Sequence, residues 1–309
     1  MANTTSDPNP PADQASDANV NQMEDLARQR VENQTVAHRP ARGQPPASKP
    51  SLLDYLDEQS ALLQGATQHF RETPEKESLS YAAEWMLDNF YLVQQTLRQI
   101  LEDMPPGFYR QLPKLAAGPL AGYPRVYAVA QELVVIQMAH LDLDRVKRFI
   151  QLYQDITPLT MGELWALPVM LRLGSIECLA QAITRITGLV RQNAPPTMTL
   201  PRELTDDEIV ANCIISLRTL ASQDWHEFFE SVSRVEQVLR GEPTGIYARM
   251  DQETRDSYRK VVEDLARSTG RSEQEVAREA VSLAASYNPV ILSEAKNLSS
   301  HRTETLRFA

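Results

Sequence analysis

The chain has 309 residues, 42% of them hydrophobic, so it is long enough for one large domain or two small ones with a proper core. Its formal net charge of -10 argues against a broad basic surface, and we expect no nucleic-acid partner. No apolar stretch approaches the roughly 18 residues that span a bilayer, and the N-terminus lacks a secretory signal. We therefore expect a soluble chain without a transmembrane segment.

Residues 1–50 have the composition of a disordered tail. They contain seven of the 20 prolines, one leucine and no isoleucine or aromatic residue. Such a segment cannot bury enough apolar surface to offset the entropy that it loses on ordering. We therefore predict that the folded part begins near Ser51.

Two long amphipathic helices are predicted after Ser51. Apolar residues recur at steps of three and four, first over 52–70 and then over 83–104. Pro74 lies between the two patterns, and a Pro-Pro-Gly run at 105–107 ends the second. This arrangement is typical of an antiparallel helical hairpin.

Residues 105–124 are predicted to form an irregular connection, because they carry five prolines and three glycines. Their leucines and aromatic residues favour packing onto the neighbouring helices. Further helices are predicted over 125–140 and from Asp144 to about Asp155.

Cap-x-x-Glu patterns mark where the later helices begin. The four pairs are Thr160 with Glu163, Thr205 with Glu208, Asp224 with Glu227, and Ser272 with Glu275. In this pattern each of the two side chains satisfies a free backbone N–H at the start of the helix. Gly270 fits the left-handed position that follows a helix end.

The stretch TPLTMGELWALPVMLR (157–172) places a single acid in an apolar helical run. Glu163 is interpreted as the capping partner of Thr160 and not as a buried catalytic acid. Pro168 should kink the helix, and Trp165 is predicted to fill the space at the bend.

These patterns predict an all-α fold, a multi-helix bundle built from helical hairpins. The expected parts are a disordered tail (1–50), a first helical part (51–193), a proline-containing linker (194–204), a second helical part (205–288) and a final tail (289–309).

The sequence carries no familiar catalytic signature: nucleotide-binding glycine loops, nucleophile elbows, H-E-x-x-H and C-x-x-C are all absent. Asp142 and Asp144 form a D-x-D pair that could bracket a hard cation, but a helix cap at Asp144 explains them without a ligand. Cys178 and Cys213 are interpreted as small buried hydrophobes, and His226 as a core-edge histidine. We therefore assign no catalytic, cofactor-binding or metal-ligating residue.

Three long blocks of unusual composition follow one another between Ser51 and Ala285. They are GFYRQLPKLAAGPLAGYPRVYAVAQELV (107–134), FIQLYQDITPLTMGELWALPVMLRL (149–173) and IYARMDQETRDSYRKVVEDLARSTGRSEQEVAREAV (246–281). Together they resemble the N-terminal region of bacterial cyclic β-1,2-glucan synthases. The tail 289–309 lacks this likeness.

The resemblance implies a very large inner-membrane enzyme that builds β-1,2-glucan from UDP-glucose, with a divalent metal in its glycosyltransferase domain. In the family the similar region is cytoplasmic and precedes the transferase, whose metal-binding aspartates and Q-x-x-R-W-type motif have no counterpart here. We therefore expect a non-catalytic N-terminal module, truncated before the membrane and catalytic domains. Its partners would be those domains, at the cytoplasmic face of the inner membrane.

Tyr123 and Arg125 in the connecting loop, together with Trp165, form the candidate contact surface, although all three could instead be core residues. A second hypothesis, from a different class, is a free-standing all-α adaptor whose groove binds a helix of another protein.

Overall fold

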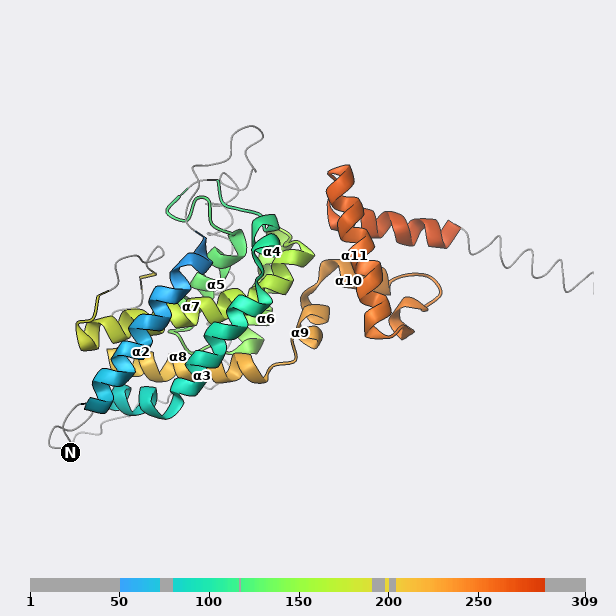
Figure 1. The fold of residues 1–309 in the computed structure, drawn as a ribbon. Coiled ribbons are helices and arrows are strands. Elements are labelled where there is room, and N and C mark those ends of the chain that lie inside the picture. The colour runs from blue at the N-terminus through green and yellow to red at the C-terminus, as the bar shows by residue number, and fades with distance from the viewer. Residues whose placement is uncertain (1–50, 73–79, 117, 191–197, 200–203, 287–309) are drawn as a thin grey trace, which may run out of the picture. The chain divides into compact units, whose positions relative to one another are not determined.

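The computed structural model describes residues 51–72, 80–116, 118–190, 198–199 and 204–286 (Figure 1). The predicted tails 1–50 and 289–309 lie outside these residues, as does most of the predicted linker 194–204. Every regular element in the described residues is a helix, which confirms the all-α prediction.

The chain divides into two compact units, Met1–Trp225 and His226–Ala309. The first unit contains η1 (Leu52–Tyr55), α2 (Leu56–Glu72), α3 (Tyr81–Asp103), α4 (Pro106–Gln111), α5 (Arg125–Ile136), α6 (Leu143–Ile156), α7 (Met161–Thr187) and α8 (Asp206–Ser222). The second contains α9 (Trp225–Val232) apart from its first residue, α10 (Arg234–Arg240), η2 (Tyr247–Arg249), α11 (Gln252–Thr269) and a helix over 273–286. The sequence-based division at 194–204 separated α8 from the first part, whereas the structure keeps α8 there because α8 packs on α7 and α3.

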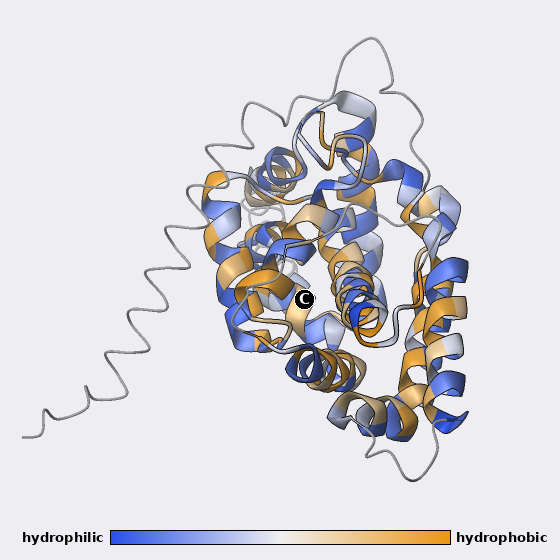
Figure 2. Ribbon diagram, turned by 90° about the vertical axis from the view of Figure 1, so that its left-hand side faces the viewer, coloured by the Kyte–Doolittle hydropathy of each residue, from blue (hydrophilic) through white to orange (hydrophobic). Residues whose placement is uncertain are grey.

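Helices α2 and α3 lie side by side (Figure 1). Each of the two helices buries one face. The predicted stripes supply core residues: Leu56, Leu63, Ala66 and Phe70 from α2, and Ala83, Met86, Val93 and Ile100 from α3. Hydrophobic and hydrophilic residues alternate around the helices in Figure 2, as expected for helices with one buried side.

Helix α7 is central to the first unit, since it packs against α2, α3, α5 and α8. It begins with the predicted Thr160–Glu163 capping box, continues through Pro168 and ends at the left-handed Gly188. It is the one helix among the described residues that is long and apolar enough to cross a membrane, yet 94% of its most apolar window is buried inside the fold. Contacts with four other helices explain why α7 is apolar nearly all round.

The connection after α3 is more regular than predicted. Its first part is the short helix α4. The first residue of α4 is Pro106, and proline is compatible with the first helical turn. Its second part is a closed loop, in which Leu115 N donates to Tyr123 O at 3.0 Å and Arg125 N donates to Pro113 O at 2.8 Å. These bonds hold the start of α5 beside the loop.

Helix α5 ends at Ile136, four residues before the predicted boundary. Met138 and Ala139 then adopt left-handed φ angles of 52° and 59°, which non-glycine residues rarely do. The Ser216 hydroxyl of α8 holds this turn, because it accepts from Leu141 N and donates to Ala139 O, each at 2.7 Å. The early end of α5 therefore depends on a distant helix.

Helix α6 is capped by Asp142, which corrects the prediction of a cap at Asp144. Asp142 Oδ1 accepts from Arg145 N at 3.0 Å, and Asp144 lies in the first turn, where the helix dipole favours its charge. The Thr205–Glu208 and Ser272–Glu275 capping pairs form as predicted, and Gly270 is left-handed.

Candidate functional site

Arg125 and Glu163 form a buried ion pair between the first turns of α5 and α7. Arg125 Nε donates to Glu163 Oε1 at 2.7 Å, and Arg125 Nη2 donates to Glu163 Oε2 and to Pro158 O. Burial alone would lower the pKa of Arg125, but the hydrogen bond and the charge of Glu163 raise it. Because Thr160 N also donates to Glu163 Oε2, one carboxylate serves both the helix N-terminus and the arginine.

The three residues of the candidate contact surface differ in exposure. Tyr123 is 3% exposed and Arg125 is 8% exposed. The Tyr123 hydroxyl lies 3.4 Å from the Tyr55 hydroxyl. Trp165 is half-buried on α7. The burial of Tyr123 and Arg125 thus favours the alternative that these two are core residues. Of the three residues, Trp165 is the one that is partly exposed to solvent.

A second buried polar group joins α5 to α7. The Tyr127 hydroxyl donates to Glu177 Oε2 at 2.7 Å and accepts from Gln131 Nε2 at 2.6 Å. Burial raises the pKa of Tyr127 well above its ordinary value, and the adjacent Glu177 carboxylate raises it further. Tyr127 therefore stays protonated and keeps donating to the carboxylate.

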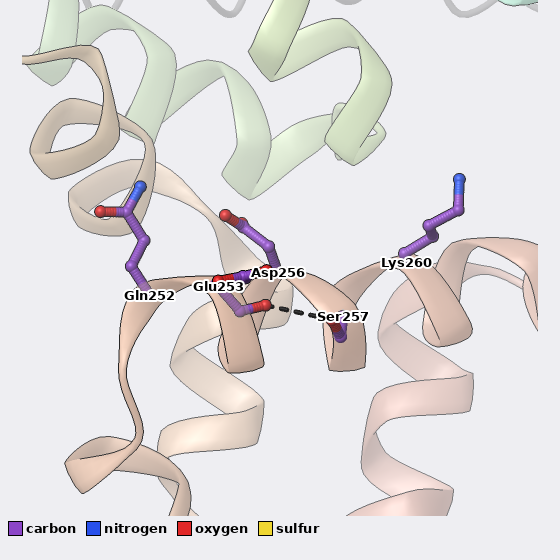
Figure 3. A pocket seen from close by; sticks show the side chains of 5 residues that line it. All are labelled: Gln252, Glu253, Asp256, Ser257 and Lys260. Carbon is purple, nitrogen blue, oxygen red and sulfur yellow. Dashed lines mark hydrogen bonds between the residues drawn. The ribbon is translucent and has the colours of Figure 1, made fainter.

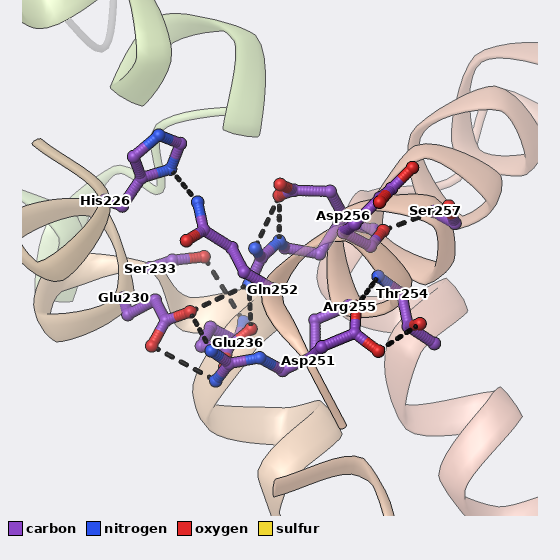
Figure 4. Close-up of polar contacts among 12 residues, drawn as sticks. His226, Glu230, Ser233, Glu236, Asp251, Gln252, Thr254, Arg255, Asp256 and Ser257 are labelled. Atoms are coloured by element: carbon purple, nitrogen blue, oxygen red, sulfur yellow. Dashed lines mark hydrogen bonds and ion pairs between the residues drawn. The ribbon is translucent and has the colours of Figure 1, made fainter. Parts of the chain in front are cut away.

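In the second unit, an ion cluster joins α9, α10, η2 and α11. At its centre, the fully buried Glu236 side chain accepts from Arg240 Nε at 2.7 Å, Tyr247 Oη at 2.7 Å and Arg259 Nη1 at 2.6 Å. Figure 4 shows Arg255 reaching both Glu230 and Glu236. Arg240, Arg255 and Arg259 thus link α10 and α11 to the carboxylates of Glu230 and Glu236.

The charge state of Glu236 follows from this cluster. Burial opposes ionisation of its carboxyl group, but hydrogen bonds from Tyr247, Arg240 and Arg259 hold its pKa below the ordinary value. Burial raises the pKa of Tyr247, and its bond to Glu236 raises it further. Glu236 is therefore an anion and Tyr247 a neutral donor at neutral pH.

An open hollow of about 440 Å³ lies along the polar side of α11 (Figure 3). Its lining residues are Gln252, Glu253, Asp256, Ser257 and Lys260. The Ser257 hydroxyl donates to the Glu253 carbonyl at 3.1 Å, and the Asp256 carboxylate pairs with Arg259. Ser257 and Asp256 thus interact within their own helix, as polar residues do on an ordinary solvated helix face.

The other candidate ligands do not come together. Among the described residues, no group of three or more His, Cys, Asp or Glu side chains could hold a metal ion. His226, predicted to lie at the edge of the core, is exposed, and its Nδ1 contacts Gln252 Nε2. Cys178 and Cys213 are buried free cysteines, as predicted.

Comparison with known proteins supports the resemblance read from the three blocks. The chain is 28% identical over 275 residues to the cyclic β-(1,2)-glucan synthase NdvB of Rhizobium meliloti (strain 1021), a match that covers 67% of this chain. The chain is related to the cyclic β-(1,2)-glucan synthases. The match covers 10% of that synthase, so the chain spans about a tenth of its length. No family model matches the chain.

The blocks that resemble glucan synthases contain many of the polar contacts described above. Arg125, Tyr127 and Glu163 come from the first two blocks, and Tyr247 and Arg259 come from the third. Of these roles, only the capping role of Glu163 was predicted from the sequence. Glu236 and Arg240 have an i, i+4 spacing within the predicted second helical part (205–288), and such a spacing is a usual sign of an ion pair on a helix. Tyr127 and Glu177 are 50 residues apart, so no local pattern could have joined them.

Proposed function

We propose that this chain is a non-catalytic helical module of a cyclic β-1,2-glucan synthase that packs against the membrane and transferase parts of such an enzyme. The match to NdvB supports this proposal. The transfer of glucose from UDP-glucose, with its divalent metal, belongs in this proposal to those other parts. The module works at the cytoplasmic face of the inner membrane.

An exposed apolar row on α11 is the observation that carries the proposal. Tyr258, Val261 and Leu265 are each about half exposed, at 49%, 57% and 48%, and their spacing of three and four puts them on one side of the helix. The row adjoins the buried Val262 and Ala266. The apolar arc of α11 is thus wider than the face that its own unit covers, as expected of a helix that packs against a partner.

The buried acids of the chain support a structural role. Glu163 binds Arg125, Glu177 accepts from Tyr127, and Glu236 is surrounded by arginines. A general acid or base must come within hydrogen-bond reach of its substrate, whereas these carboxylates are buried and bound within the chain.

Co-purification with an NdvB-type synthase that lacks the matching region tests the proposal. We expect the chain to bind that synthase and to restore glucan synthesis from UDP-glucose, while the chain alone makes no glucan. A Tyr258→Ser, Val261→Ser, Leu265→Ser variant should lose most of the binding, because the apolar row is removed.

The matched control is Tyr91→Ser, which removes an aromatic residue that is 63% exposed on α3 and should leave binding unchanged. Glucan synthesis by the chain alone would refute the non-catalytic role. Failure of the intact chain to bind the synthase would refute the packing role and favour the adaptor hypothesis.

A further inference from the structure

Gln59 is an unusual residue in the core of the first unit. Its side chain is 0% exposed on α2, and neither Nε2 nor Oε1 has a hydrogen-bond partner among the described residues. On α2 it stands between the buried Leu56 and Leu63, and α2 packs against α3 and α7. A glutamine amide can donate two hydrogen bonds and accept two, so its full hydrogen-bonding capacity lies inside the fold.

An apolar residue would serve this position better if packing were its only task. Burying an amide without partners is destabilising, and buried polar side chains in native proteins nearly always have a protein or water partner. Apart from Thr67, whose hydroxyl donates to Leu63 O, the other buried residues of α2 are leucine, alanine or phenylalanine. We therefore expect the Gln59 amide to have a hydrogen-bond partner other than the described side chains of the core.

The elements next to Gln59 in the chain and in the fold carry further polar groups. Four residues before Gln59, at the end of η1, the hydroxyl of the half-buried Tyr55 lies 3.4 Å from the Tyr123 hydroxyl. On α7, which packs on α2, the Ser175 hydroxyl is buried and has no partner among the described residues. An internal water needs two to four polar contacts, and the two ends of the Gln59 amide can supply two of them.

We propose that the core of the first unit binds a water molecule at the amide of Gln59. Water fits the chemistry because it can donate to Oε1 and accept from Nε2, and because the amide is uncharged. A cation is a poorer match, since the described residues contain no group of carboxylates, histidines or cysteines that could hold one. This inference does not depend on the proposed function.

Oxygen-17 relaxation dispersion of water, which counts long-lived internal water molecules, tests the proposal. We expect Gln59→Met, which keeps the side-chain length and removes the amide, to lower the count by at least one relative to the intact chain. The control is Gln64→Met on the exposed side of the same helix, which should leave the count unchanged. An unchanged count in folded Gln59→Met would overturn the proposal.

A second measurement covers the case in which Gln59→Met does not fold. A high-resolution crystal structure of the intact chain should show an ordered water within hydrogen-bond distance of Gln59 Nε2 or Oε1. Well-defined density for a Gln59 side chain with no such water would overturn the proposal.

Discussion

Glu163 accepts hydrogen bonds from Arg125, which lies 38 residues earlier in the chain, while it caps its own helix together with Thr160. A capping glutamate is ordinarily exposed and contributes little beyond its helix. Here the same carboxylate neutralises a buried guanidinium, so its loss would leave an uncompensated charge in the core. The pair ties the start of α5 to the start of α7.

Glu163→Gln should therefore destabilise the first unit by about 3–5 kcal/mol, the usual cost of breaking a buried pair by removing one partner. Glutamine keeps the size and one acceptor of the side chain but loses the charge that Arg125 needs. Urea unfolding followed by tryptophan fluorescence measures this effect, because Trp85 and Trp165 both lie in that unit.

Glu208→Gln is the control, since Glu208 forms the same capping box with Thr205 but is exposed. Its loss of stability should be several times smaller. Equal losses in the two variants would show that the Arg125 contact adds nothing to the cap.

The contrast between these two glutamates shows what the sequence could reveal. The capping boxes were predictable because both members lie within four residues and act through the first turn. The partner of Glu163 was not predictable, because Arg125 reaches it only after α5 and α7 pack together. The end of α5 was misplaced for the same reason: the residue that holds the turn, Ser216, is 75 residues away from Leu141.

Tyr127→Phe should cost about 1.5–3 kcal/mol, because it removes a buried hydrogen bond to the Glu177 carboxylate. Tyr123→Phe is the control, since Tyr123, in the loop before α5, is also only 3% exposed but its hydroxyl lies 3.4 Å from the Tyr55 hydroxyl. We expect a loss below about 1 kcal/mol for that control. Fluorescence-monitored unfolding compares the two, and a larger loss for Tyr123→Phe would contradict the assigned role of Tyr127.

Ser216→Ala should cost about 1–3 kcal/mol, because Leu141 N and Ala139 O both lose a buried partner. Amide hydrogen exchange of Leu141 should also accelerate, since its donor is no longer bound. Ser222→Ala, at the exposed end of the same helix, should change neither quantity. Unchanged protection of Leu141 in Ser216→Ala would mean that α8 does not hold the left-handed turn.

Glu236 should make the stability of the second unit depend on pH. Its pKa in the folded chain lies below the ordinary value of 4.5, so the folded state binds the proton less readily than the unfolded state. Its contribution is therefore fully present above about pH 4.5 and is lost as pH falls through the lower folded pKa. Glu236→Gln should lower the free energy of unfolding at pH 7 by about 1.5–3 kcal/mol and flatten its decline in acid.

The second unit contains no tryptophan in its range His226–Ala309, so the measurement must report on α11 itself. Hydrogen exchange of the buried α11 amides, recorded between pH 7 and pH 3 and corrected for the intrinsic exchange rate, gives the local opening free energy. Glu253→Gln, on the exposed first turn of α11, should keep the pH dependence of the intact chain. The local opening free energy of the Glu236→Gln variant should decline in acid less steeply than that of the intact chain. An equally steep decline would show that the arginine cluster does not depend on the charge of Glu236. In that case α11 would be held in its unit by the packing of Val262 and Ala266.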